Sequence, residues 1–210
     1  MENFREQAGS KDYRKLHLGC FDKPLDGWHN TDITPHIFIS RIPGLPFLLF
    51  KSGLISKERF EQHREGIFNK VHYLNVTKVF PFEKNTFDYV FISHMLEHLY
   101  PWQAGFCMHE VYRVLKYGGI VRISVPDLDR IIANYHALSS HQFLLNFFEC
   151  DQRNFNNQHH WQYNEVSLTE LLRDKSGFAK VYRCKFQQGK CIDLDIIDNR
   201  PESLFMEAQK

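Results

Sequence analysis

The stretch from Lys15 to Asp32 constrains the fold more than any other part of the chain. A short apolar run with Leu16 and Leu18 ends at Gly19, a polar turn follows, and a second short run ends on the carboxylate of Asp32. Thirteen positions separate Gly19 from Asp32, too few for a full crossover helix followed by a strand. The stretch therefore predicts two neighbouring parallel strands whose crossover helix is stunted or replaced by a loop.

The chemistry of the same stretch favours a nucleoside ligand. A glycine at a strand end lets a ligand approach the backbone closely, and an acid ending the next strand can accept both ribose hydroxyls. The G-x-G-x-x-G fingerprint of dinucleotide-binding folds is absent, because Phe21 stands where a second glycine is expected. The layout therefore predicts a nucleoside site without specifying the nucleoside.

Length and composition favour one domain over residues 1–210, because a chain of 210 residues with 43% hydrophobic content can bury one substantial core. Lys and Arg number 26 against 25 Asp and Glu, which leaves a net charge of +1 and gives no reason to expect a nucleic-acid partner. The five cysteines form no C-x-x-C pair, and the polar N-terminus does not resemble a signal peptide. We therefore expect reduced thiols and a cytoplasmic location.

A block at about residues 34–70 interrupts the alternation of strands and helices. Its apolar part, Ile42 to Phe50, reads IPGLPFLLF and is far shorter than the roughly 20 residues of a spanning helix. The following segment, 56–69, predicts a helix capped by Ser56. We expect a lid-like insertion; a plain packing insert fits the pattern equally well, and peripheral contact with a membrane stays open.

The remainder of the chain predicts an α/β fold with a doubly wound, mostly parallel sheet and an antiparallel edge strand. The expected strands are 71–76, 89–92, 120–125, 178–186 and 203–208. The expected helices are 101–116, closed by a left-handed glycine at Tyr117-Gly118-Gly119; 128 to about 145; and a helix capped by Ser167.

Three motifs, in this order, carry a family resemblance: FPFEKNTFDYVFISHMLEHL, EVYRVLKYGGIVRISVPDL and the ending NRPESLFMEAQK. With Gly19 and Asp32, they make the chain similar to class I S-adenosylmethionine-dependent methyltransferases. The resemblance is to the type-11 branch associated with bacterial surface-polysaccharide clusters. It implies a seven-stranded Rossmann-like sheet with the cofactor across the carboxyl ends of the first strands.

The resemblance also implies a set of cofactor-binding residues. Asp32 takes the ribose hydroxyls, and Asn75, with its side-chain oxygen, lies with Val76 on the adenine side. The remaining members lie under the methionine part or face the sulfonium: Leu18, Gly19, Cys20, Ser93 and His94.

An acceptor hydroxyl needs a base, and a neutral imidazole suits proton removal near pH 7. His98 is the first choice and His94 the second, with Glu97 orienting either one; a purely structural role for Glu97 is an equal alternative. His159 and His160 lie in a polar loop with Trp161 and Tyr163, a composition that suits either sugar contacts or solvent.

The residues HMLEH also match the H-x-x-E-H pattern of zinc proteases. Ubiquinone and small-RNA O-methyltransferases carry an E-x-x-E-H metal site at the corresponding place, so a divalent metal on His94, Glu97 and His98 is an alternative. It is not favoured, and no metal ligands are assigned.

The motifs together predict an S-adenosylmethionine-dependent methyltransferase of the EC 2.1.1 class, acting in polysaccharide biosynthesis. The expected acceptor is a hydroxyl of a sugar, a glycan or another small molecule. A catalytically silent methyltransferase-like binding module, suggested by Phe21 and Asn75, and a zinc hydrolase are the alternatives. The acceptor's identity, the methylated atom and the oligomeric state stay open.

Overall fold

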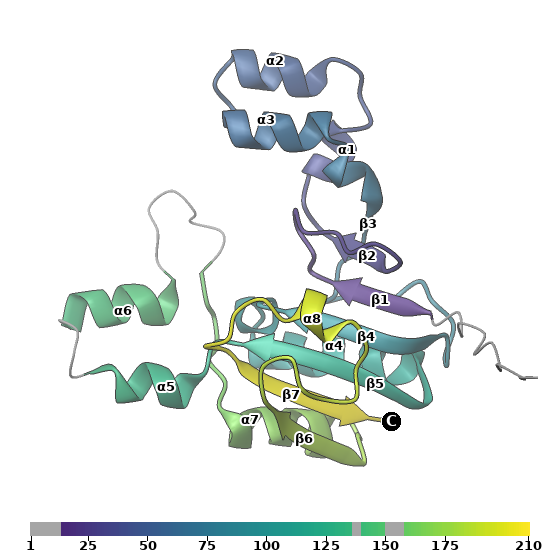
Figure 1. The fold of residues 1–210 in the computed structure, drawn as a ribbon, viewed down its shortest axis with the longest axis vertical. Helices are drawn as coiled ribbons and strands as arrows, with labels where there is room; N and C mark the ends of the chain where they lie inside the picture. Colours follow the sequence, from purple (N-terminus) through teal and green to yellow (C-terminus); the bar gives the residue numbers. More distant parts are fainter. Residues whose placement is uncertain (1–13, 136–139, 150–157) are drawn as a thin grey trace, which may run out of the picture.

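The structure, a computed structural model, describes residues 14–135, 140–149 and 158–210. A seven-stranded sheet in the order β3-β2-β1-β4-β5-β7-β6 organises the molecule (Figure 1). Strands β3, β2, β1, β4 and β5 are parallel, whereas β7 is antiparallel to β5 and β6. The doubly wound sheet with an antiparallel pairing at one edge confirms the predicted fold class. The strands are β1 Lys15–Leu18, β2 His29–Asp32, β3 Val71–Tyr73, β4 Phe87–Ser93, β5 Leu115–Val125, β6 Lys180–Cys184 and β7 Leu204–Gln209.

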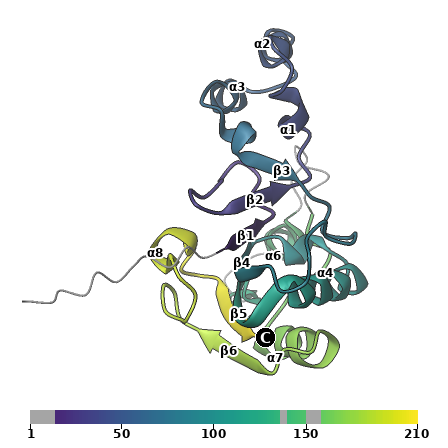
Figure 2. The same ribbon diagram turned by 90° about the vertical axis from the view of Figure 1, so that its right-hand side faces the viewer.

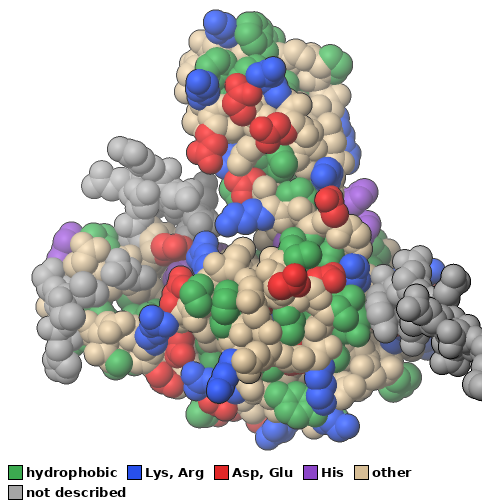
Figure 3. Space-filling view, in the orientation of Figure 1, with side chains coloured by type: hydrophobic (Ala, Val, Ile, Leu, Met, Phe, Trp, Pro, Cys, Tyr) green, Lys and Arg blue, Asp and Glu red, His purple; other side chains and the backbone are tan. Residues whose placement is uncertain are grey.

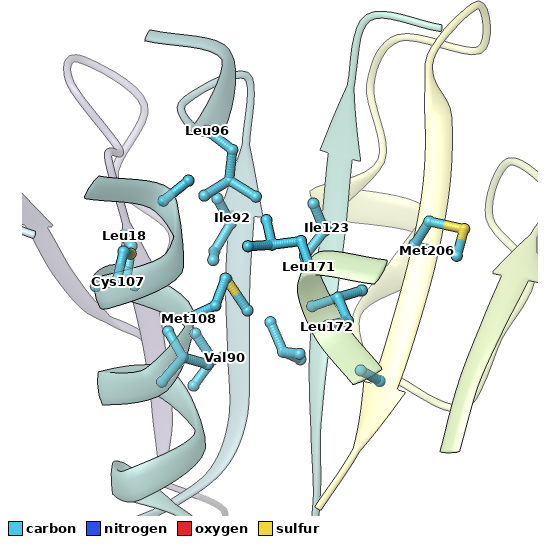
Figure 4. Close-up of a cluster of buried hydrophobic side chains, with 14 of the residues drawn as sticks. Leu18, Val90, Ile92, Leu96, Cys107, Met108, Ile123, Leu171, Leu172 and Met206 are labelled. Atoms are coloured by element: carbon cyan, nitrogen blue, oxygen red, sulfur yellow. The ribbon is translucent and has the colours of Figure 1, made fainter. Parts of the chain in front are cut away.

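The main core lies between the sheet and the helices of one face. Val90 and Ile92 of β4 point toward Cys107 and Met108 of α4 (Pro101–Val114), and Leu171 packs beside them (Figure 4). Leu171 belongs to the π-helical turn η4 (Leu171–Lys175) that continues α7 (Glu165–Glu170). Because side chains alternate along a strand, Phe91 faces the opposite side.

A smaller cluster covers the opposite face, where the long segment between β6 and β7 carries only the short helix α8 (Leu194–Ile197) (Figure 2). Arg122 of β5 is fully buried under this segment. Its guanidinium contacts Asp198 and Glu207 and donates to the backbone carbonyls of Lys185 and Gln188 at 3.1 and 3.0 Å. A satisfied buried ion network therefore fixes the connection between β6 and β7 to the sheet.

Residues 34–70 form a lobe that projects beyond β3 (Figures 1 and 2). It contains α1 (His36–Ile39), α2 (Leu45–Lys51), α3 (Lys57–Arg64) and the 3-10 turn η1 (Ile67–Lys70). Ser56 caps α3 as predicted, accepting from the backbone N–H of Arg59 at 3.1 Å. Hydrophobic side chains lie among charged ones on the lobe's surface (Figure 3). Within the described residues, no helix is both long and apolar enough to cross a bilayer.

The short connection after Gly19 is a helix-free loop, as the spacing predicts. The helix expected over 56–69 is too long: α3 ends at Arg64, and the left-handed Gly66 (φ 73°) separates it from η1. Three details later in the chain are also wrong. The helix expected to end at Lys116 ends at Val114, and Leu115 already begins β5, so the left-handed Gly118 (φ 79°) lies within the strand and caps no helix. Its neighbour Gly119 has no room for a side chain, because a Cβ would lie 2.9 Å from the carbonyl oxygen of Lys116.

The helix expected over 128–145 is two helices, α5 (Leu128–Ala133) and α6 (Ser140–Phe148). The segment 136–139 between them lies outside the described residues, as do residues 1–13 and part of the polar loop expected before Trp161. The third wrong detail is the cap at Ser167: α7 begins earlier, and Asn164 caps it by accepting from the Ser167 N–H at 3.0 Å. The Ser167 hydroxyl in turn accepts from the backbone N–H of Asn164 at 3.0 Å, which completes a capping box.

The buried His17 predicts a pH dependence of stability. Burial lowers its pKa from 6.5 to about 4, and a hydrogen bond to Asn30 partly offsets the shift. Because the unfolded chain takes up the proton first, the stability contributed by neutral His17 is present above about pH 6.5 and is lost as the pH falls toward 4. Between pH 7 and pH 4 the free energy of unfolding should fall by about 3 kcal/mol more in the wild type than in His17→Gln.

Urea denaturation at pH 7, 5.5 and 4 measures this difference. The exposed His109 supplies the control, since His109→Gln should keep the wild-type slope. Equal slopes in the wild type and His17→Gln would contradict the assignment.

Candidate functional site

The carboxyl ends of β1, β2, β4 and β5 meet at one edge of the sheet, because these strands run parallel. Residues that directly follow the strands therefore lie near one another, although they are far apart in the sequence. Gly19 follows β1, Asp32 ends β2, and Ser93 ends β4 with His94 directly after it. The structure thus brings most of the predicted site residues to one edge.

Gly19 is held in a conformation that only glycine adopts without strain. Its φ is +70°, and a Cβ at this position would lie 2.6 Å from Cγ of Met95. The N–H groups of Gly19 and Cys20 both donate to the carbonyl oxygen of Thr31, at 2.9 and 3.1 Å. The end of β1 is therefore bare backbone, packed against the residue that follows His94.

Asp32 uses its carboxylate to fix the loop after β1. One oxygen accepts from the backbone N–H of Phe21 at 2.9 Å, and the other accepts from the N–H of Thr34 at 2.7 Å. Burial raises the pKa of Asp32, and the two backbone hydrogen bonds oppose that shift. Each carboxylate oxygen keeps further acceptor capacity for a ligand.

Phe21 occupies the expected glycine position, and its side chain lies against the lobe. Its backbone adopts φ +45°, the left-handed conformation that favours glycine. Its ring is 41% exposed and lies under the guanidinium of Arg59, 4.5 Å from the ring centroid. Arg59 of α3 also forms an ion pair with Asp22 at 3.1 Å. The lobe therefore docks on the loop between β1 and β2 through Arg59, with further contacts from Gln62 to Asp22 and from Lys70 to Asp26.

The other residues expected beside the methionine part are buried. Leu18 is fully buried, so only its backbone faces the edge of the sheet. Cys20 is 4% exposed, and burial raises the pKa of its thiol far above the usual range. Neither side chain offers reactive chemistry.

Asn75 follows β3 and turns its side chain back on its own loop. Its Oδ1 accepts from both the backbone N–H and the hydroxyl of Thr77, at 2.9 and 2.8 Å. The amide nitrogen is therefore the better placed group for a ligand, and not the oxygen that the sequence suggested. Val76, the other residue expected on the adenine side, is half-buried and packs against the main core.

His94 lies between an acid and a hydroxyl. Its Nδ1 is 3.1 Å from Oε1 of the fully buried Glu97, and its Nε2 is 2.9 Å from Oγ of Ser203. Its backbone N–H donates to the carbonyl oxygen of Ser124 at 2.9 Å, and the Ser93 and Ser124 hydroxyls lie 3.0 Å apart. The Glu97 carboxylate thus lies beside the His94 ring, and Ser203, from just before β7, is a neighbour of His94 that sequence reasoning missed.

His98 lies in a different environment. It ends the 3-10 turn η2 (Leu96–His98), donates from Nδ1 to the carbonyl oxygen of Gln158 at 3.3 Å, and packs edge-on against His159. His94 has φ +47° and precedes η2, so the two histidines of HMLEH do not lie one turn apart on a helix as the zinc-protease pattern requires. Ligand atoms of His98, Glu97 and His159 lie within 4.8 Å of one another. Sequence reasoning placed His159 only in a polar loop.

A pocket opens beside this site, next to the start of β7. Its volume is about 540 Å³. Ser203, which contacts His94, lies in its wall, whereas His94 itself does not line the pocket. Charged residues supply much of the lining: Asp127, Arg130, Arg183, Lys185 and Glu202.

Comparison with protein families finds one match. The model of the methyltransferase domain Methyltransf_11 matches residues 52–123. This range includes β4, η2 and α4, and it begins after Asp32. A comparison with curated proteins found no match.

Solved structures similar to this chain share its fold. A SAM-dependent methyltransferase from Methanosarcina mazei has a TM-score of 0.54 and 17% identity, with 95% of this chain and 92% of that chain covered. A SAM-dependent methyltransferase from Archaeoglobus fulgidus has a TM-score of 0.50 and 15% identity, with 94% of this chain and 86% of that chain covered. PigF, solved with SAH, has a TM-score of 0.51 and 15% identity, with 94% of this chain and 50% of that chain covered.

The sheet is therefore the Rossmann-like methyltransferase fold. The domain match and the shared fold make the chain similar to S-adenosylmethionine-dependent methyltransferases. They do not indicate the acceptor.

Proposed function

We propose that this chain binds S-adenosylmethionine across the carboxyl ends of β1, β2 and β4 and methylates a hydroxyl of a sugar or another small hydroxylated acceptor. The observation that carries the proposal is the pair formed by the bare backbone at Gly19 and the fixed carboxylate of Asp32. A nucleoside ligand needs both a close approach to backbone and an acceptor for its ribose hydroxyls. The comparisons add the methyltransferase fold.

The residues at this edge fit the cofactor. Asp32 retains acceptor capacity toward two hydroxyls while its backbone partners hold it in place. The ring of Phe21 lies against Arg59 of the lobe. The amide nitrogen of Asn75 can donate to a ring nitrogen of adenine. These positions support the predicted cofactor residues.

The bound cofactor supplies an electrophilic methyl group on a sulfonium, and the protein aligns the acceptor and removes its proton. We assign proton removal to His94 in preference to His98. Glu97 lies beside Nδ1 of His94, so the Nε2 lone pair is available to a hydroxyl, and the Ser203 hydroxyl already lies at hydrogen-bonding distance from it. A bound cofactor would supply the methyl group and keep the electron pair of the broken S–CH₃ bond on its sulfur, and His94 Nε2 would take the acceptor proton.

Two surfaces support a polar, sugar-like acceptor, one next to Ser203 and one next to the end of η2. The pocket next to Ser203 is lined by charges of both signs, which suits an acceptor with several hydroxyl groups. Exposed aromatic rings lie at the start of α4. The ring of Tyr100 stacks on those of Trp102 and His160, with ring centroids 4.7 and 4.4 Å apart. Flat rings of this kind pack against the apolar faces of sugars. A role in surface-polysaccharide synthesis is part of this proposal and rests on the sequence resemblance.

Asp32→Ala should weaken the binding of S-adenosylmethionine at least tenfold, because the ribose loses its acceptor and the loop at Phe21 loses a hydrogen bond. Isothermal titration calorimetry measures the change. Asp26→Ala is the matched control, since Asp26 lies on the same loop and forms only an exposed ion pair with Lys70. Equal affinity in the two variants would refute the ribose role. No binding by the wild type at millimolar cofactor would favour the silent module.

His94→Ala should lower kcat roughly 100-fold while leaving cofactor affinity unchanged, because the base is lost and the nucleoside site is not. The assay detects methylated product from labelled S-adenosylmethionine over a panel of sugars and sugar nucleotides. His98→Ala in parallel tests the ranking of the two histidines. A loss confined to His98→Ala would return the base role to His98.

A further inference from the structure

Buried polar atoms without a hydrogen-bond partner gather at one place in the described part of the chain. They are both carboxylate oxygens of Glu97, Oε1 of Gln162 and the hydroxyl of Tyr163. Gln162 contacts the ring of His159 at 2.9 Å, and the carboxylate of Glu97 helps to raise the pKa of Tyr163, although burial is the larger cause. Native proteins rarely leave such groups unsatisfied, so a cluster of them indicates a bound species.

Glu97 is the most telling member of this group. Its side chain is fully buried, and the one ion-pair contact that the described residues give it is with the ring of His94, which lies 3.1 Å from one oxygen without the alignment of a hydrogen bond. Removing a carboxylate from water is costly unless a positive charge or several donors compensate. Its backbone carbonyl, by contrast, accepts from the N–H groups of both His160 and Trp161. The segment with His159 is therefore tied directly to Glu97.

Two imidazoles complete the arrangement. The ligand atoms of Glu97, His98 and His159 lie within 4.8 Å of one another. His98 donates from Nδ1 to the Gln158 carbonyl, so its Nε2 lone pair is free to act as a ligand. His159 holds the carboxylate of Glu149 at 2.9 Å on Nε2, the pairing that orients metal-bound histidines in proteins. The amide of Gln162 lies against Nδ1 of His159 and would turn aside when that nitrogen becomes a ligand.

We propose that Glu97, His98 and His159 bind a divalent first-row transition metal ion, with Glu149 holding His159 in orientation. Two imidazoles and one carboxylate suit Zn²⁺, Fe²⁺ or Co²⁺ and not Mg²⁺, which prefers oxygen ligands. Ligand bonds of about 2.0–2.1 Å place tetrahedral ligand atoms about 3.3 Å apart, so the cluster contracts around the ion. This set differs from the one considered from the sequence, because His159 replaces His94.

The ion would compensate the negative charge of the Glu97 carboxylate. It would also join η2 to the segment that carries His159, Gln162 and Tyr163. Glu97 would then hold the metal with one oxygen and orient His94 with the other. The proposal concerns binding, so it stands independently of the methyl-transfer reaction.

The test is a titration of chelator-treated protein with Co²⁺, followed by its visible d–d absorption. The wild type should bind one equivalent of Co²⁺, and the d–d absorption of the bound ion should be that of a site with few ligands. Glu97→Gln and His159→Asn should each weaken binding at least 100-fold. His160→Asn is the matched control, because His160 adjoins His159 in the sequence and is exposed; it should bind like the wild type. Competition with Zn²⁺ and Mg²⁺ should show displacement by Zn²⁺ alone.

Circular dichroism checks that each variant folds, and His98→Gln provides a third variant should one fail. Absence of Co²⁺ binding by the wild type at millimolar metal would overturn the proposal and leave water as the species at Glu97. Unchanged binding in Glu97→Gln and His159→Asn would also overturn it. Cofactor titration of the same samples separates the two proposals: loss of metal should leave the Asp32 site able to bind S-adenosylmethionine, and Asp32→Ala should still bind metal.

Discussion

The parallel alignment of β3, β2, β1, β4 and β5 is the constraint on which the candidate site depends. Parallel strands place all their carboxyl ends at one edge, so Gly19, Asp32 and His94 converge although 75 positions separate the first from the last. The contact between Gly19 and Met95 shows how tight this convergence is, since a single added methyl group would meet the Met95 side chain. The chemistry at the edge therefore follows from the topology.

The two faces of the sheet are held by different physical means. On one face α4 and the helical segment α7–η4 bury a continuous apolar core. On the other, a small apolar cluster is joined by the buried ion network of Arg122, Asp198 and Glu207, which fixes a long segment with little regular structure. That segment leads into Ser203, so the network also determines where the hydroxyl beside His94 lies. A charge buried far from the edge of the sheet thus supports its geometry.

Much of the fold could be predicted because the signals are local. The apolar runs of the strands, the spacing from Gly19 to Asp32 and the Ser56 cap each depend on a few neighbouring residues. The errors arise where tertiary structure overrides such signals: Gly118 lies inside a strand because Leu115 already pairs with Phe87, and Asn164 takes the cap from Ser167. The proximity of His159 and Ser203 to the site could not be predicted, because long-range packing alone brings them there. Phe21 adopts the left-handed backbone conformation that favours glycine, and its N–H donates to the Asp32 carboxylate in that conformation.

The central claim is that the carboxyl ends of β1, β2 and β4 form the cofactor site. Hydrogen–deuterium exchange with and without S-adenosylhomocysteine tests it most directly, because it locates the ligand without an acceptor and without substitutions. The account predicts slower exchange in peptides covering residues 18–22, 31–35 and 93–97, with unchanged exchange in β6. Protection confined to other parts of the chain, or no protection at saturating ligand, would contradict it.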